Sequence, residues 1–301
     1  MPAFHAMFVH AHPDDESSKA ASTMARYADE GHRVSVVTLT DGMAGDILNP
    51  AMDRPGVKEQ LPEIRKEELA RALDILGVTD HVDLGYRDSG FVDGFDGDGS
   101  VLPPDAFYNQ PLDDVVGRLV AVVRELRPHV LVTYPEDGGY PHPDHIRCHD
   151  VTAAAFDAAG DPTAYPEAGE PWTPSKLYYS HPFTRPKLEA LHDACEERGI
   201  DSPYGEFLAR GRRRRRFDDP VTTRVEVSAY LEHRHKALLA HATQIDPNGR
   251  WFAVPDEVVA EVYPYEDFTL ARSRVGVAIP EGSLFDGLEH VDAPVGHTSL
   301  A

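Results

Sequence analysis

Residues 6–16 read AMFVHAHPDDE, and this stretch decides the fold class. The apolar run from Ala6 to Ala11 predicts a buried strand. Pro13 fixes its own φ and biases the preceding residue away from the helical region, so the chain bends directly after this strand. A helix is expected from Ser17 to Glu30, where apolar residues recur at helical spacing. The polar segment HPDDE at 12–16 therefore joins a strand to a helix.

The same alternation continues to residue 160. Strands alternating with helices of this length predict βαβ units, hence an α/β fold with a mostly parallel sheet flanked by helices. Further strands are expected at Arg33–Leu39, His81–Leu84 and His129–Tyr134, and helices at Glu59–Leu76, Leu112–Leu126 and Ile146–Ala159.

After residue 160 the pattern weakens, and we expect a smaller C-terminal α+β portion. Residues 1–160 would form the catalytic core, 161–287 would complete the substrate site, and 288–301 would be a mobile tail. Strands are expected in this portion at Lys176–Ser180 and Val221–Val227, and helices at Arg185–Arg198 and Ser228–His241.

The composition excludes several classes of protein. The 301 residues carry 29 basic and 51 acidic side chains, a net charge of −22, which disfavours nucleic acid and anionic lipid as partners. The arginine run at 212–216 is the exception, and we interpret it as a solvated segment. Two cysteines, Cys148 and Cys195, exclude a disulfide framework. No apolar run is long enough for a membrane helix and no signal peptide is visible, so a cytoplasmic location is expected.

A second segment, HPDH at 142–145, follows the glycine-rich GGY at 138–140. In parallel sheets, ligands bind beyond the carboxyl ends of the strands. Both His-Pro-Asp segments fall there, and so do the strand-following DG at 41–42 and DSG at 88–90. We therefore expect four loops to converge on one rim.

Each segment alone has a simpler interpretation. HPDDE would also serve as a helix N-terminus, since aspartate caps helices well. A second metal arrangement is open too, because His145, Cys148 and His149 have helical i, i+3, i+4 spacing. Cys148 equally suits a small buried helix position, and Tyr140 could simply pack. Two such segments on the same rim favour the functional interpretation.

The two segments together support metal-assisted amide hydrolysis. Asp14 would accept a proton from water and pass it to the leaving amine. His142 would donate to the developing oxyanion, with Asp144 orienting it or stabilising its cationic form, and Tyr140 would add a phenolic hydrogen bond. These roles assume that a metal ion is bound by three side chains, His12, Asp15 and His145, and keeps a fourth coordination position for water.

The segments AHPDDE (11–16) and GYPHPDH (139–145) resemble the two signatures of the LmbE/PIG-L family of zinc-dependent deacetylases. That resemblance implies a Rossmann-like fold and hydrolysis of N-acyl groups on glucosamine units. It implies one Zn²⁺ per chain, with Fe²⁺ as the other metal to consider. It also implies a base at Asp14, a carbonyl-polarising His142, and the metal ligands His12, Asp15 and His145.

Other stretches resemble one branch of this family, whose members cleave the cysteine–glucosamine amide of mycothiol S-conjugates in detoxification. The implied partner is a small thiol–pseudodisaccharide conjugate, with Arg65 and Asp88 on its inositol and sugar hydroxyls and Lys19 near its cysteine end. The likeness runs from about residue 5 to 287. It is carried by DESSK (15–19), GEPW (169–172), KLYY (176–179), HATQIDP (241–247) and LARSR (270–274).

One loop departs from that pattern, and other functions remain open. Residues 41–46 read DGMAGD where the family commonly has GGERGE, so Asp46 is a shortened acid at the expected substrate site. The alternatives are the sister deacetylase of N-acetylglucosaminyl-inositol and a paralogue serving one mycothiol adduct in natural-product biosynthesis. A third is a binding module, which the proton-transfer pair Asp14 and His142 disfavours. The oligomeric state is open.

Overall fold

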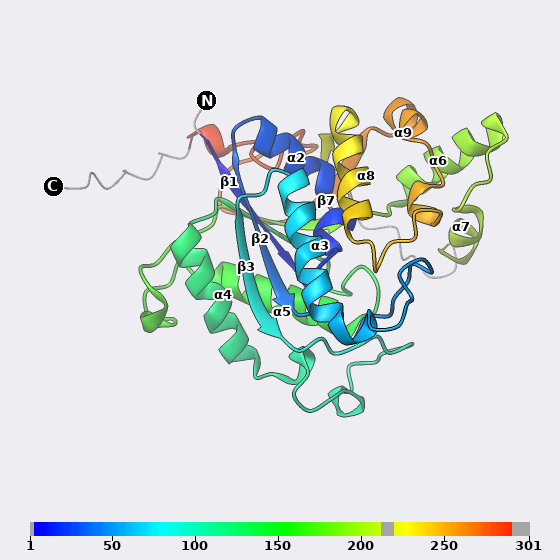
Figure 1. The fold of residues 1–301 in the computed structure, drawn as a ribbon. Helices are drawn as coiled ribbons and strands as arrows, with labels where there is room; N and C mark the ends of the chain where they lie inside the picture. The colour runs from blue at the N-terminus through cyan, green and yellow to red at the C-terminus, as the bar shows by residue number, and fades with distance from the viewer. Residues whose placement is uncertain (1–2, 212–219, 291–301) are drawn as a thin grey trace.

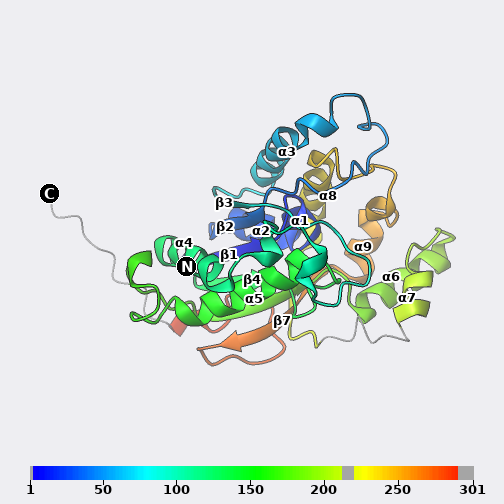
Figure 2. The ribbon, with the colours of Figure 1, turned by 90° about the horizontal axis from the view of Figure 1, so that it is seen from below.

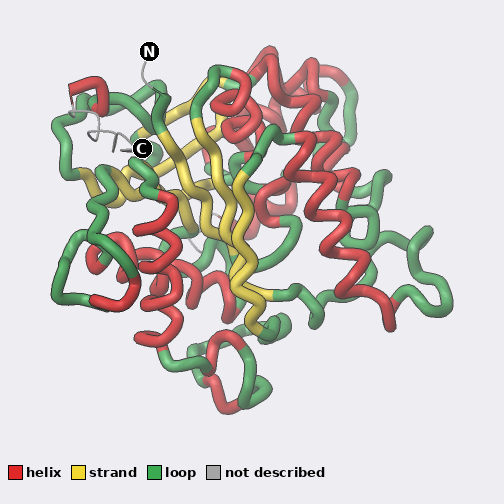
Figure 3. Tube along the Cα trace, turned by 60° about the vertical axis from the view of Figure 1, so that its left-hand side comes forward, coloured by secondary structure: helices red, strands yellow, loops and turns green. Residues whose placement is uncertain are grey.

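The computed structural model describes residues 3–211 and 220–290, and the arginine run at 212–216 lies outside them. One sheet runs through the molecule (Figures 1 and 3). Its seven strands lie in the order β3-β2-β1-β4-β5-β7-β6. The first five strands in this order are parallel, and β7 is antiparallel to both β5 and β6. The strands are β1 His5–His10, β2 Arg33–Thr40, β3 Asp80–Tyr86, β4 Val130–Thr133, β5 Lys176–His181, β6 Thr223–Glu226 and β7 Tyr265–Ser273.

Helices cover both faces of the sheet, which confirms the predicted fold class. Helices α2, α3 and α8 lie on one face and α4 and α5 on the other (Figure 1). Helices α6, α7 and α9 gather at one end of the molecule, away from α4 (Figure 2). The helices are α1 Asp15–Ser18, α2 Ala21–Asp29, α3 Leu61–Ile75, α4 Leu112–Leu126, α5 Pro143–Ala158, α6 Arg185–Arg198, α7 Gly205–Gly211, α8 Leu231–Ala240 and α9 Asp256–Val262.

Strand β1 shows why its sequence is apolar on both sides. Ala6 and Phe8 belong to the core cluster under α2, α3 and α8, whereas Met7 and Val9 belong to the cluster under α4 and α5. Successive side chains of a strand point to opposite faces, so a strand covered twice needs an unbroken apolar run. None of the described helices is long and apolar enough to cross a membrane.

The helix expected over residues 17–30 is interrupted. Helix α1 ends at Ser18, Lys19 is extended, and Ala20 adopts a left-handed conformation with φ +69° before α2 begins. The break places the first N–H groups of α2 against a distant acceptor: Glu266 of β7 accepts from the backbone of Ser22 and Thr23 at 3.2 and 2.8 Å. A tertiary cap therefore sets the start of α2, which local periodicity could not indicate.

The C-terminal part completes the same sheet. Strand β7 was not expected, because prolines around it obscured its pattern, and it brings β6 onto the sheet edge. The core cluster that contains Ala6 also contains Tyr178 and Phe268, so residues on both sides of position 160 share one core. Leu288, assigned to a tail, is buried in that cluster, and residues 291–301 lie outside the described chain.

Candidate active site

The four loops at the carboxyl ends of β1 to β4 meet around His12. Its Nε2 lies 3.2 Å from Asp144 Oδ2 and 3.6 Å from Asp88 Oδ1. The backbone N–H of Asp88 donates in turn to the Asp41 carboxylate at 3.1 Å. The rim expected from the strand order is therefore present, and its side chains are in contact.

Three side chains on this rim form a compact donor set. Asp15 Oδ2 lies 3.5 Å from His12 Nδ1 and 3.4 Å from His145 Nε2. One ligand atom from each of these residues lies within 4.8 Å of the others, and all three side chains are buried. This spacing suits convergence on one cation.

Local structure holds His145 in a ligand orientation. Helix α5 begins at Pro143, three residues before the predicted start, so His145 stands in its first turn with His142 as N-cap. The Nδ1–H of His145 donates to the Gly138 carbonyl at 3.1 Å, which leaves the Nε2 lone pair facing Asp15. Metal-binding histidines characteristically donate their second N–H in this way.

His12 is oriented by a carboxylate. Its Nε2–H donates to Asp144 Oδ2, which also accepts from the backbone N–H of Ser89 at 2.9 Å. Nδ1 is then the nitrogen left facing Asp15. Asp144 Oδ1 is buried with no hydrogen-bond partner among the described residues.

Among the described residues, no hydrogen bond joins the Asp144 carboxylate to His142 as predicted. Instead His142 Nδ1 accepts from the backbone N–H of Asp144 at 3.1 Å, as the cap of α5. The neutral ring must then carry its proton on Nε2. Burial, followed by the nearby His12 and His145, lowers the pKa of His142 to about 2, so the neutral form dominates here.

A second group of possible ligands overlaps the first: His12, Asp88, His142 and Asp144. Its members have other partners, because Asp88 accepts from the backbone N–H groups of Ala44 and Gly90. Among the described residues, the ligand atoms of His145, Cys148 and His149 do not come close enough together to hold one metal ion. Cys148 faces the core, where burial raises the pKa of its thiol to about 12.

The rim carries an excess of buried negative charge. Besides the two histidines, Lys19 and Arg65 contact its acids, pairing with Asp15 and Asp14 respectively. Burial would raise the pKa of Asp15, but Lys19 and His145 hold it well below its usual range. Buried charges need compensation, so a cation fits this donor set. Three of the acids, Asp15, Asp88 and Asp144, are buried, and the fourth, Asp14, is partly exposed.

The backbone of Asp14 is strained and is held in place by neighbouring side chains. Its φ is +113°, a region that residues with a side chain seldom occupy. Its backbone N–H donates to Glu16 at 2.9 Å, and Glu16 is buried against His241 at 2.6 Å. Burial would raise the pKa of Glu16, but His241 lowers it to about 2. A charged pair therefore fixes the backbone of Asp14.

The residues predicted to bind substrate lie in different settings. Arg65 is 3% exposed and donates to the carbonyls of Pro13 and Gly42 and to Asp14 Oδ2, so it supports the loops from beneath. Lys19 pairs with Asp15 and lines a cavity. The Asp46 side chain is 89% exposed and lies 3.9 Å from Lys58, outside that cavity lining.

This reaction cavity, of about 410 Å³, opens beside Asp14 and Asp15. Tyr140 lies on its wall, with its hydroxyl 3.4 Å from His145 Nε2. Its far end is aromatic and comes entirely from residues after position 180: Phe183, Phe207 and Trp251.

Sequence reasoning missed several members of the site. Tyr134 donates to Asp15 Oδ2 at 2.7 Å and accepts from the Ala11 N–H at 2.8 Å. Phe91 is 59% exposed, with its ring centre 6.1 Å from that of His142. The polar end of a buried strand was the available signal for Tyr134, whereas nothing local distinguished Phe91.

Comparisons with known proteins agree with this site. Residues 7–156 match the family model of the GlcNAc-PI de-N-acetylases, PIG-L. A mycothiol S-conjugate amidase of Streptomyces coelicolor is 46% identical, covering 94% of this chain and 96% of that protein. A 1D-myo-inositol 2-acetamido-2-deoxy-alpha-D-glucopyranoside deacetylase of Streptomyces avermitilis is 39% identical, covering 96% and 98%.

Solved structures share the fold at lower identity. The N,N'-diacetylchitobiose deacetylase of Pyrococcus horikoshii has a TM-score of 0.58 at 18% identity, covering 97% of this chain and 88% of that one. A 4-carboxy-2-hydroxymuconate hydratase of Pseudomonas putida has a TM-score of 0.60 at 15% identity, covering 91% and 99%. Because this fold carries different reactions, function must be argued from the site.

Proposed function

Because the chain belongs to the PIG-L/LmbE family, whose named relatives hydrolyse amides, we propose that it is a zinc-dependent amidase cleaving the cysteine–glucosamine amide of mycothiol S-conjugates. The products would be an N-acetylcysteine S-conjugate and glucosaminyl-inositol. The sequence resemblance described above and the 46% identity to the Streptomyces coelicolor amidase both support this assignment.

The observation that carries the proposal is the reaction cavity. A deacetylase has only a two-carbon acyl group on one side of the scissile bond, whereas a conjugate amidase must hold a substituted cysteine there. The cavity extends from Asp14 and Asp15 past Lys19 to an aromatic end at Phe183 and Trp251. Its volume of about 410 Å³ lies in the range of small-molecule sites and suits a large acyl group.

We assign the metal to His12, Asp15 and His145. The orientation of both imidazoles and the excess of buried carboxylates support this set over the overlapping one. A zinc ion held there would supply Lewis-acid polarisation of the amide carbonyl and a nucleophilic water near neutral pH. Ferrous iron fits the same donors.

The remaining groups move protons and stabilise charge. Arg65 donates to Asp14 Oδ2, so Oδ1 is available to take a proton from water and deliver it to the leaving glucosamine nitrogen. The neutral His142 ring carries its proton on Nε2 and would donate it to the developing oxyanion. Asp144 then acts by orienting His12, and Tyr140 adds a second donor at the cavity wall.

The two parts of the substrate, the sugar and the cysteine, would lie on opposite sides of the metal. We place the sugar on the side of Asp88, next to the exposed ring of Phe91, and the cysteine on the side of Lys19. Arg65 would act indirectly, by holding Asp14 and its loop, and Asp46 would contact only groups that project outside the cavity.

The test compares two amides on one preparation. The bimane S-conjugate of mycothiol and N-acetylglucosaminyl-inositol are incubated with the zinc-loaded enzyme, and a chelated sample serves as control. We expect cleavage of the conjugate that disappears on chelation and returns with zinc. Absence of cleavage of both amides by the zinc-loaded enzyme would contradict the proposal.

The second candidate is the deacetylase of N-acetylglucosaminyl-inositol. The 39% identity to the Streptomyces avermitilis deacetylase over almost the whole chain favours it. Its site would share the metal ligands and Asp14, so the acyl side alone distinguishes the two functions. Cleavage of the N-acetyl sugar without cleavage of the conjugate would establish this function instead.

A further inference from the structure

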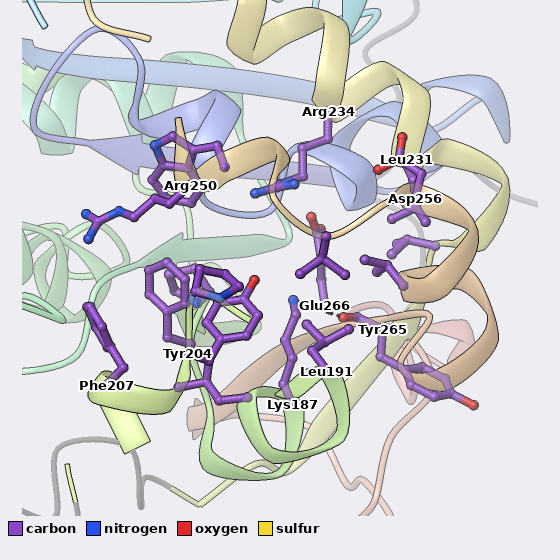
Figure 4. Close-up of a pocket in the computed structure, with 18 residues that line it drawn as sticks. Lys187, Leu191, Tyr204, Phe207, Leu231, Arg234, Arg250, Asp256, Tyr265 and Glu266 are labelled. Atoms are coloured by element: carbon purple, nitrogen blue, oxygen red, sulfur yellow. Dashed lines mark hydrogen bonds between the residues drawn. The ribbon is translucent and has the colours of Figure 1, made fainter. Parts of the chain in front are cut away.

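A second cavity adjoins the aromatic end of the reaction cavity (Figure 4). Helices α6, α8 and α9 and the segment from Pro203 to Phe207 contribute to its walls. It shares Pro182, Phe183, Phe207, Arg250 and Trp251 with the reaction cavity, so the two spaces adjoin across these side chains. We call this second cavity the substituent pocket.

The walls of the substituent pocket combine apolar and aromatic side chains with charged ones. Leu191, Leu231 and Val254 line it. At the shared boundary, Phe183 and Trp251 stack with ring centres 5.7 Å apart and an interplanar angle of 26°. Its volume of about 80 Å³ is far below that of the reaction cavity, so it would hold a terminal group of ring size and not a whole substrate.

Three cations line this pocket without a carboxylate partner among the described residues, and two of them, Arg234 and Lys187, do not also line the reaction cavity. Arg234 of α8 lies over the Trp251 ring at 5.6 Å and makes no hydrogen bond or ion pair within the described chain. Lys187 of α6 makes one long hydrogen bond, 3.4 Å to the Tyr265 carbonyl. Figure 4 shows these two side chains extending from opposite sides of the pocket.

The acids of the pocket are engaged elsewhere. Glu266 accepts from the backbone of Ser22 and Thr23 at the start of α2, and Asp256 lies 3.5 Å from His235. Burial lowers the pKa of Lys187, against the opposing effect of Asp267 and Glu266. A desolvated cation without a close partner is costly, and an anionic ligand would relieve that cost.

We propose that the substituent pocket receives the S-substituent of the conjugate and selects aromatic groups that end in a carboxylate. The aromatic ring would pass Phe183 and Trp251, and the carboxylate would meet Arg234 and Lys187. This inference rests on the proposed amidase function and deepens it by naming the class of conjugate.

The experiment compares a matched pair of substrates, the S-benzyl and S-(4-carboxybenzyl) conjugates of mycothiol. The zinc-loaded enzyme should cleave the carboxybenzyl conjugate with kcat/KM about tenfold higher, the scale of one charge-assisted contact of about 1.4 kcal/mol. Arg234→Gln and Lys187→Gln should each reduce this preference, because kcat/KM should fall more for the carboxybenzyl conjugate than for the benzyl conjugate. Lys236→Gln, on the exposed side of α8, should preserve the preference.

A second kind of variant tests whether the S-substituent binds in this pocket, and it leaves the charged side chains in place. Val254→Phe fills the substituent pocket, so it should slow both benzyl conjugates about tenfold and spare the S-methyl conjugate. Thermal melting by circular dichroism checks that each variant is folded. Equal kcat/KM for the benzyl pair in the wild type, or a preference that persists in the Arg234→Gln/Lys187→Gln double variant, would overturn the proposal.

Failure of the amidase function is separable from failure of this pocket. If no conjugate is cleaved, calorimetry measures binding of N-acetyl-S-(4-carboxybenzyl)cysteine to the metal-free protein. Binding that weakens about tenfold in Arg234→Gln supports the pocket even then, and absence of binding rejects it.

Discussion

At Asp14 the chain stores backbone strain beside the proposed reaction centre. A residue at φ +113° costs of the order of 1–3 kcal/mol and persists only where its surroundings enforce it. Here the enforcing contacts are the Glu16 acceptor for its N–H and the Arg65 donor to its carboxylate. The strain is consistent with a side chain held for proton transfer.

Replacing Asp14 by asparagine should remove the proposed base and keep the turn. We expect Asp14→Asn to lower kcat for the bimane conjugate by about 10²-fold or more, the usual contribution of general acid–base catalysis. Bound zinc, measured by atomic absorption, should remain near one per chain. Asp53→Asn, an exposed acid of the loop after β2, is the control and should keep wild-type kcat. Full activity of Asp14→Asn would rule out this role.

Two neighbouring glycines offer a matched test of the metal site. Gly138 and Gly139 have φ +73° and +74°, so alanine is strained equally at both. A Cβ on Gly138 would approach His145 Cβ to 2.6 Å, whereas one on Gly139 meets nothing within 4 Å. Gly138→Ala should therefore weaken zinc binding about 10- to 100-fold relative to Gly139→Ala, measured by competition with a chromogenic chelator. Equal affinities would show that the Gly138 carbonyl does not position the ligand.

At the scale of elements, a buried ion pair ties the segment after β7 to the sheet. Lys176 of β5 donates to Glu281 Oε1 at 2.6 Å, and Tyr178 and Thr223 each donate to Glu281 Oε2 at 2.8 Å. Lys176 and Glu281 are both buried. The network therefore connects β5, β6 and the returning chain.

Breaking this pair should leave a buried charge without its partner. We expect Lys176→Met to lower the free energy of unfolding by about 3 kcal/mol in urea titrations. Adding Glu281→Gln should recover part of that loss, because glutamine still accepts from Tyr178 and Thr223. The partly exposed surface pair of Arg26 and Glu30 provides the control, and Arg26→Met should cost less than about 1 kcal/mol. A double variant no more stable than Lys176→Met would contradict the electrostatic explanation.

Prediction from sequence succeeded where the signal is local. The apolar run of β1 and the amphipathic Leu112–Leu126 helix matched the structure closely, and strand order alone placed the four loops on one rim. The interruption at Ala20 was missed because its cause, the Glu266 acceptor, is remote in the chain. The aromatic end of the cavity was missed for the same reason, since Phe183 and Trp251 meet only after folding.

At the scale of the whole molecule, buried neutral histidines should make stability depend on pH. Burial, as the largest cause, lowers the pKa of both His5 and His181 to about 4. The unfolded chain binds these protons near pH 6.5, so their contribution is complete above that pH and is lost as pH falls toward 4. Between pH 7 and pH 5, each of these histidines should lower the free energy of unfolding by at most about 2 kcal/mol.

Urea titrations of the chelated protein between pH 7 and pH 5 measure this dependence without the metal. His5→Asn lowers stability at pH 7 but should flatten the dependence, because one titrating group is gone. A slope unchanged by His5→Asn would show that this histidine does not titrate with unfolding.

The reacting groups and the aromatic end of the cavity come from different lengths of chain. The proposed metal ligands and Asp14 all precede residue 150, beyond the carboxyl ends of parallel strands, whereas Phe183, Phe207 and Trp251 all follow residue 180. Substitutions at these three aromatic positions can therefore reshape the cavity without replacing a reacting group, whereas the later residue His241 must be kept because it pairs with Glu16, which holds the Asp14 backbone. Such an arrangement would let the preference for the acyl group diverge through a few later positions while purifying selection preserves the reacting groups.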